Sequence, residues 1–141
     1  MGPARSAAGF SIVELLVVIL VTGIVAGMAV PQLLMAYERT RQRATLADMR
    51  AIGMAAGTYR VDHEEWPSAL EDLDPDFLQP VPGSDAWGND WSYEMSEGSY
   101  TLTSYGSDGN PGPEPPDTWR DEPVEADLIL ADGVFVQSPN Y

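Results

Sequence analysis

Side chains of the kind that enzymes use are sparse in this sequence. The single histidine, His63, lies in Asp62-His63-Glu64-Glu65, which lacks the second histidine of a zinc-binding HExxH helix. There is no cysteine and no G-x-S-x-G nucleophile elbow. Asp74 and Asp76 would be the nearest approach to a glycosidase pair, but the domain around them is small for a substrate cleft. We therefore expect His63 to be a solvated surface residue and the chain not to be an enzyme.

Glu14 is the side chain in the most unusual surroundings. It lies near the start of an apolar run of nineteen residues, Ile12 to Val30. Such a run would form a helix of about 28 Å, which matches the hydrocarbon core of a bilayer. Inserting a carboxylate at the centre of a membrane helix costs roughly 2.5 to 3.5 kcal/mol. We infer that Glu14 has a function; the alternative is a side chain that extends to the membrane interface without a partner.

The apolar run is either retained as an anchor or removed as a signal peptide. Gly27-Met28-Ala29 would serve as the cleavage site of a secretory signal, and cleavage there would leave a secreted module. An acid has no use in the apolar part of a signal, so Glu14 favours retention. Arg39, Arg41 and Arg43 follow the run, where they could meet anionic lipid or an acidic neighbour. By the positive-inside rule they could instead place the rest of the chain in the cytoplasm.

Charge is divided unevenly along the 141 residues. The net charge is −15, all seven basic residues are Arg, and six of them precede position 62, whereas nineteen of the 22 acids lie at or beyond it. An acidic domain repels nucleic acid, so we exclude nucleic acid as a partner. A metal cation or a basic protein surface fits the charge better, although the acids could also simply solvate a small domain. Residues 106–127 are so rich in Gly, Pro and acids that they do not pack without help.

The elements that must position these residues begin with a long helix. Beyond Pro31, which would loosen or bend it, residues 32–60 contain no further proline. Apolar residues recur there at spacings of three and four, which predicts an amphipathic helix with one stripe packed on a sheet. The residues of this stripe are Leu46, Met49, Ile52, Ala56 and Tyr59.

The acidic part reads as a small sheet with irregular connections. We predict a short helix capped by Ser68, with Ala69, Leu70 and Leu73 on its apolar face. The remaining elements are a Gly88-Asn89 turn, a hairpin of Trp91–Met95 with Ser99–Tyr105 closed by Glu97-Gly98, and one strand or a hairpin in 128–136 around Asp132-Gly133.

The start of the apolar run resembles the leader junction of type IV pilins and type II secretion pseudopilins. The residues that carry the resemblance are Gly9-Phe10-Ser11-Ile12-Val13-Glu14-Leu15-Leu16. It implies that a prepilin peptidase cuts after Gly9 and methylates the new amine of Phe10, so that Glu14 is the fifth residue of the mature chain. The amine and the Glu14 carboxylate would then lie about one helical turn apart. Within a subunit or between neighbours they would neutralise each other in a low dielectric.

A second resemblance, to the major pseudopilin of type II secretion, lies in the acidic part. Its residues are Asp85-Ala86-Trp87-Gly88-Asn89-Asp90-Trp91-Ser92-Tyr93 and the later Ser104-Tyr105-Gly106-Ser107-Asp108-Gly109. A lone W-G-N could be no more than a tryptophan buried beside a turn, but its place after a pilin-type helix argues for the resemblance. In that family a calcium ion holds the following loop.

Carried over, the resemblance gives calcium as the cofactor of this loop. Its ligands would be the carboxylates of Asp108 and Asp127 and the carbonyls of Tyr105 and Ser107, with Glu125 or Asp117 as further candidates. Oxygen ligands from a flexible loop suit calcium, and loop closure would be coupled to folding. The alternative is a flexible loop without a ligand.

The sequence therefore predicts an α+β protein of type IV pilin-like fold, in which a long N-terminal helix packs on a small antiparallel sheet with a long acidic loop. We divide it into a leader (1–9), a transmembrane and filament-core helix (10–36), its amphipathic continuation (37–60) and a periplasmic head (61–141). The resemblance implies a homopolymeric pseudopilus that drives protein export from the inner membrane. Its partners would be prepilin peptidase, the inner-membrane assembly platform, minor pseudopilins and, before assembly, membrane lipid.

Two other functions stay open on the sequence alone. The first is a type IV pilin or minor pilin for adhesion, motility or DNA uptake. The second, from another class, is the secreted calcium-binding module that cleavage of the apolar run would leave.

Overall fold

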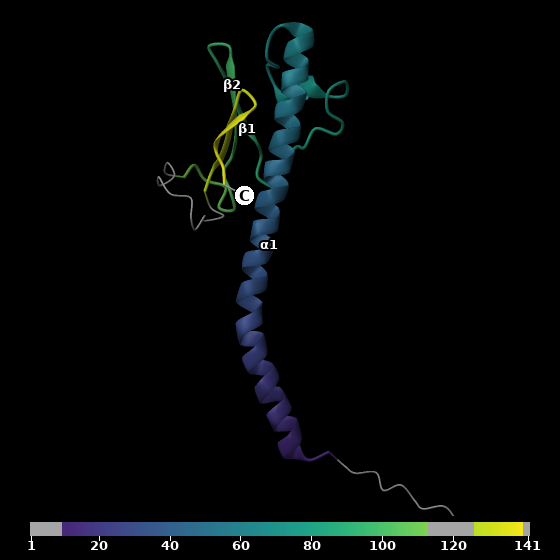
Figure 1. Cartoon of the computed structure of the whole chain (residues 1–141), viewed down its shortest axis with the longest axis vertical. Coiled ribbons are helices and arrows are strands. Elements are labelled where there is room, and N and C mark those ends of the chain that lie inside the picture. The colour runs from purple at the N-terminus through teal and green to yellow at the C-terminus, as the bar shows by residue number, and fades with distance from the viewer. Residues whose placement is uncertain (1–9, 113–125, 140–141) are drawn as a thin grey trace, which may run out of the picture. The chain divides into compact units, whose positions relative to one another are not determined.

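A computed structural model of the chain describes residues 10–112 and 126–139. Its first element is the helix α1, Ile12–His63, of 52 residues (Figure 1). Pro31 lies inside α1, which remains helical on both sides of it, and the helix ends three residues beyond the predicted position 60. The chain divides into two compact units, residues 1–37 and residues 38–141. Each unit is described separately below.

The described part of the first unit is apolar helix whose side chains are exposed. By length and composition, α1 is the one helix among the described residues that could cross a membrane, and its most apolar window has a mean hydropathy of 2.6 and is 0% buried. The hydroxyl of its polar Thr22 donates within the helix. Thr22 Oγ1 lies 2.9 Å from the carbonyl oxygen of Val18 and 3.0 Å from that of Ile19. This surface therefore needs an apolar environment outside the monomer.

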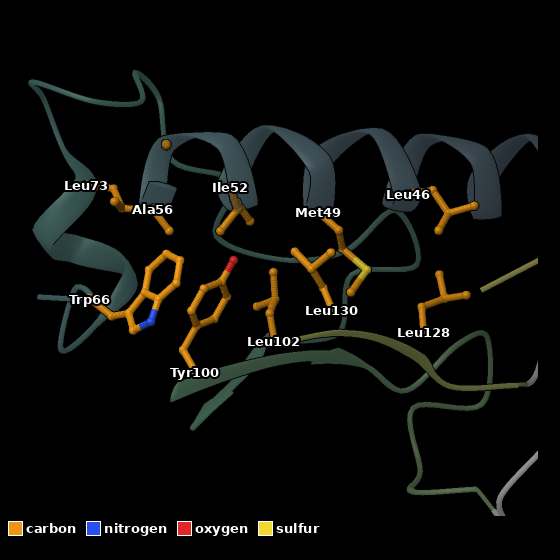
Figure 2. Close-up of a cluster of buried hydrophobic side chains, with 11 residues drawn as sticks. Leu46, Met49, Ile52, Ala56, Trp66, Leu73, Tyr100, Leu102, Leu128 and Leu130 are labelled. Atoms are coloured by element: carbon orange, nitrogen blue, oxygen red, sulfur yellow. The ribbon is translucent and has the colours of Figure 1, made fainter. Parts of the chain in front are cut away.

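The second unit contains the hydrophobic core. Leu46, Met49, Ile52 and Ala56, on one face of α1, are at most 1% exposed. Figure 2 shows this stripe facing side chains from the sheet and, at its end, Trp66 and Leu73 from the connecting segment. The sheet side chains are Tyr100, Leu102, Leu128 and Leu130, all at most 1% exposed. The predicted stripe is thus confirmed, with Tyr59 packed at the edge of the core.

The sheet has four antiparallel strands in the order β1-β2-β3-β4 (Figure 1). Their bounds are Ser92–Ser96, Ser99–Ser104, Leu128–Ala131 and Val134–Gln137. The predicted hairpin of β1 and β2 turns at Glu97 and Gly98, both with positive φ. The C-terminal apolar runs form a hairpin rather than one strand, since Asp132 and Gly133 also have positive φ. Type I′ turns of this kind match the twist of the paired strands.

The segment between α1 and β1 covers the end of the core. It contains a 3₁₀ helix, Leu70–Leu73, whose N-cap is Ala69 and not Ser68 as predicted. The backbone N–H of Ala69 donates to the Asp72 carboxylate at 3.0 Å, so the acid at the third helical position bonds back to the cap residue. The fold class predicted from the sequence, α+β with a long helix on an antiparallel sheet, is confirmed.

Replacing Gly53 should destabilise the head because α1 and the sheet meet there. A Cβ at Gly53 would lie 2.9 Å from Cδ2 of the buried Leu130 and 3.5 Å from the Tyr100 hydroxyl. We expect Gly53→Ala to lower the free energy of unfolding by about 1–3 kcal/mol, as overpacking does. A Cβ added at Gly57, one turn later in the same helix, would meet no other described part of the chain within 4 Å, so Gly57→Ala should raise the free energy of unfolding by up to ~1 kcal/mol. Urea unfolding of the detergent-solubilised chain, followed by tryptophan fluorescence, measures both. Equal stabilities of the two variants would contradict this packing.

Candidate functional site

The first candidate site is the beginning of α1. Ser11 caps the helix: its side-chain oxygen accepts from the N–H of Val13 at 3.3 Å, and its carbonyl accepts from the N–H of Glu14 at 3.1 Å. This cap fixes Glu14 in the first helical turn, where the partial positive charge of the helix N-terminus favours a carboxylate. Phe10 lies four residues before Glu14 and is exposed, whereas Gly9 lies outside the described residues. The pairing of the Phe10 amine with Glu14 stays a prediction.

The second candidate site is the turn from Asp85 to Asn89, which folds around a buried carboxylate. Asp85 is 5% exposed. Its Oδ1 accepts from the backbone N–H groups of Trp87 at 3.0 Å and Asn89 at 2.9 Å, and its Oδ2 accepts from the Ser104 hydroxyl at 2.7 Å. Gly88 adopts φ +93°, which completes the tight turn. A carboxylate with three donors is well compensated for burial, so Asp85 has a structural role.

The third candidate site is the loop that follows β2, together with Asp127 just before β3. Gly112 donates its N–H to Oδ2 of Asp127 at 3.0 Å, and this contact brings the two ends of the acidic loop together. Asp127 is 8% exposed, and its Oδ1 is buried and has no hydrogen-bond partner among residues 10–112 and 126–139. Burial raises the pKa of Asp127, the N–H of Gly112 lowers it, and the negative charge of Asp108 raises it further. The loop therefore holds two neighbouring acids with an unsatisfied buried oxygen.

The predicted calcium ligands are placed only in part. Asp108 is exposed and lies near enough to Asp127 to affect its pKa, while Tyr105 and Ser107 are half-buried in the same loop. Glu125 and Asp117 lie outside the described residues. Within residues 10–112 and 126–139, no group of three or more His, Cys, Asp or Glu side chains is arranged to hold a metal ion. The calcium site therefore stays a prediction.

His63 forms an aromatic contact at the end of α1. Its ring stacks on Tyr59 at 4.0 Å between centroids, meets Phe77 edge-on at 5.7 Å, and places Nδ1 3.1 Å from the Tyr59 carbonyl. It is exposed, as expected, but it is packed rather than only solvated.

Sequence reasoning missed the partners that hold the Asp85 turn. Trp87 donates its indole N–H to a Glu38 carboxylate oxygen at 2.7 Å, and Ala86 donates its N–H to Oγ1 of Thr45 at 3.2 Å. Glu38 and Thr45 lie on α1, more than forty positions away in sequence, so no local pattern connects them to the turn. Thr45 did carry a signal, because a polar residue within the buried stripe requires a partner.

The N-terminal part of the chain matches a known family of proteins. Residues 4–30 match the family described as the prokaryotic N-terminal methylation motif, which covers the predicted leader junction and the apolar run. With the long helix on a small antiparallel sheet, this match defines a type IV pilin-like protein.

Among known proteins, similarity extends to the head. Type II secretion system core protein G of Vibrio cholerae serotype O1 is 30% identical over 131 residues, which cover 81% of this chain and 90% of that protein. The proteins of that name from Pseudomonas aeruginosa and Escherichia coli K12 are 28% and 27% identical and cover 77% and 75% of this chain and 89% and 86% of their own lengths. The chain belongs to the family of type II secretion system core protein G.

Replacing Asp85 should unfold the turn, because the three donors around its carboxylate would lose their acceptor. We expect Asp85→Ala to lower the free energy of unfolding by about 4.5 kcal/mol or more, since three hydrogen bonds to a charged group are lost and each contributes ~1.5–3 kcal/mol. Asp90 directly follows the turn and is exposed, so Asp90→Ala should change stability by less than about 0.5 kcal/mol. Urea titration of both variants provides the measurement. A loss below ~1 kcal/mol at Asp85 would show that the turn does not depend on this carboxylate.

Proposed function

We propose that the chain is the major structural subunit of a pseudopilus, the filament of a type II secretion system. The observation that carries the proposal is the exposed apolar part of α1 in a chain of this family. Its most apolar window is 0% buried, so lipid must cover it before assembly and other copies of the helix afterwards. Membership of the core protein G family favours this function over an adhesive pilin and over a secreted module. The family is one of structural subunits, and catalysis is not part of the proposal.

The proposed route to the filament begins with prepilin peptidase. Cleavage after Gly9 would retain the apolar helix as an anchor in the inner membrane and expose a methylated amine at Phe10. The head would lie in the periplasm, where heads coat the filament while the assembly platform and minor pseudopilins act on the subunit. Pairing of the Phe10 amine with Glu14 would remove two poorly solvated charges from the apolar environment. The same contact would select the register of each entering subunit.

Glu14→Ala should block assembly without blocking processing. Without the carboxylate, the amine at Phe10 has no counter-charge in the filament core, and we expect the yield of sheared filaments and the secretion of exported protein to fall about tenfold or more. Mass spectrometry should still find a methylated N-terminus at Phe10. Asp62→Ala is the matched control, because it removes a carboxylate from the same helix at an exposed position of the head, outside the apolar part, and should leave assembly unchanged.

Two outcomes would contradict this mechanism. Normal filaments from Glu14→Ala would remove the proposed role of the carboxylate. A mature N-terminus at Val30 would instead show that the apolar run is a signal peptide and that no filament core exists.

We further propose that calcium closes the acidic loop. The buried Oδ1 of Asp127 has no partner within the described part of the chain and lies near the charge of Asp108, which supports a cation at this position. The carbonyls of Tyr105 and Ser107 and the carboxylate of Glu125, with Asp117 as an alternative, would complete the ligand set. A bound cation would neutralise both acids and connect the strands β2 and β3 across the loop between them.

Chelation should lower the melting temperature of the wild-type chain. A ligand present at a hundred times its Kd stabilises by ~2.7 kcal/mol, which for a domain of this size corresponds to a shift of about 10–20 °C. Asp127→Asn should abolish most of the difference in melting temperature between samples with calcium and samples with chelator. Asp90→Asn, which lies outside the loop, should retain that difference. Melting curves in excess magnesium distinguish specific binding of calcium from general screening of the acidic charges by a divalent cation. A wild-type chain that melts at the same temperature with and without chelator would overturn the calcium site.

A further inference from the structure

We propose that the turn Asp85–Asn89 is the positioning element of the calcium loop and that it connects this loop to α1. On this inference, which rests on the proposed calcium site, loading the loop with calcium also tightens the contact of the turn with Glu38 and Thr45. The turn would thus transmit the state of the loop to the helix.

The first link joins Asn89 to the loop. Its Nδ2 donates to the carbonyl of Gly106 at 2.8 Å. On the other side, Gly109 adopts φ +65° and lies so close that a Cβ there would be 2.9 Å from Oδ1 of Asn89. One amide side chain therefore contacts the loop just before Ser107 and just after Asp108, two of the proposed ligands. Their backbone conformation depends on Asn89 because both of its contacts frame them.

The second link makes the turn rigid. Asp85 and Asn89 are joined by two hydrogen bonds. The backbone N–H of Asp85 donates to the Asn89 carbonyl at 2.9 Å, and the backbone N–H of Asn89 donates to Oδ1 of Asp85 at 2.9 Å. The Ser104 hydroxyl ties Oδ2 of the same carboxylate to the last residue of β2. The loop leaves the sheet immediately after Ser104. The bond between Ser104 and Asp85 therefore fixes the turn beside the start of the loop. A displacement of Asn89 therefore displaces the whole turn.

The third link joins the turn to the helix. The N–H of Ala86 donates to Thr45 Oγ1, and the indole of Trp87 donates to Glu38. Glu38 and Thr45 are seven residues apart, which places them two turns apart on one face of α1. The three links form a continuous path of hydrogen bonds from the loop to the base of the head. Where calcium binding strengthens the turn, thermodynamic linkage requires that weakening the turn weakens calcium binding by the same factor.

The test uses the full chain in detergent, with calcium titrated by isothermal calorimetry. Asn89→Ala should bind calcium about tenfold more weakly than wild type, and Thr45→Val, which removes the acceptor at the far end without touching the loop, about two- to threefold more weakly. Ser99→Ala is the control: it removes the hydrogen bond to Asp132 at 2.9 Å, at the opposite end of β2, and should leave the affinity unchanged. Matched melting curves in chelator show that the variants are folded.

A second readout separates transmission from simple loss of stability. With 5-fluorotryptophan in the chain and Trp87→Phe for assignment, calcium should shift the ¹⁹F signal of Trp87 in wild type but not in Asn89→Ala at saturating calcium. Calcium affinity within twofold of wild type in Asn89→Ala, or the same Trp87 shift in both proteins, would overturn the inference. Absence of calcium binding by wild type would instead overturn the proposed site and the inference with it, which is a distinguishable result.

Discussion

One helix has to satisfy two different environments, and this constraint determines the rest of the molecule. In its first part the apolar side chains cover all sides and none of the most apolar window is buried, whereas in its second part a single stripe is buried under the sheet. A helix that is apolar all round needs lipid or other helices, while an amphipathic one needs a single packed face. The change occurs along one continuous α1, so an anchor and a head are joined without a loop. The small head can be stable because the helix supplies one side of its core.

Two buried acids in the head differ in their hydrogen-bond partners, and this difference distinguishes a structural residue from a candidate ligand. Asp85 and Asp127 are 5% and 8% exposed. Asp85 is surrounded by three donors, which compensate its charge without any added ligand. Among the residues that the structure describes, Asp127 has one donor, one oxygen without a partner and a second acid nearby. A buried carboxylate in that state is costly unless a cation or a proton compensates it, which distinguishes the loop from the turn.

Much of this architecture could be predicted from sequence because its signals are local. The stripe from Leu46 to Ala56 followed from helical spacing, and the hairpin turn at Glu97-Gly98 from turn chemistry. The cap at Ala69 could not be predicted, since the competing acceptor, Asp72, lies inside the turn. The contacts of the Asp85 turn with α1 and β2 were also invisible, because hydrogen bonds between distant segments leave no periodic signal. For the candidate site, the family resemblance gave Asp108 and Asp127, but the burial of Asp127 could be seen only in the fold.

Charge decides which part of the chain can supply the cohesion of a filament. Nineteen of the 22 acids lie at or beyond position 62, accompanied by one Arg, so heads packed side by side repel each other. At physiological salt this repulsion is screened beyond about 8 Å, and it persists where heads touch. The free energy gained by burying the apolar side chains of each helix does not depend on charge and is not screened by salt. The first part of α1 must therefore supply most of the free energy of assembly, which repulsion between the heads reduces. A divalent cation in each head would reduce that repulsion, and in this way a site that closes one loop would also ease the packing of its neighbours.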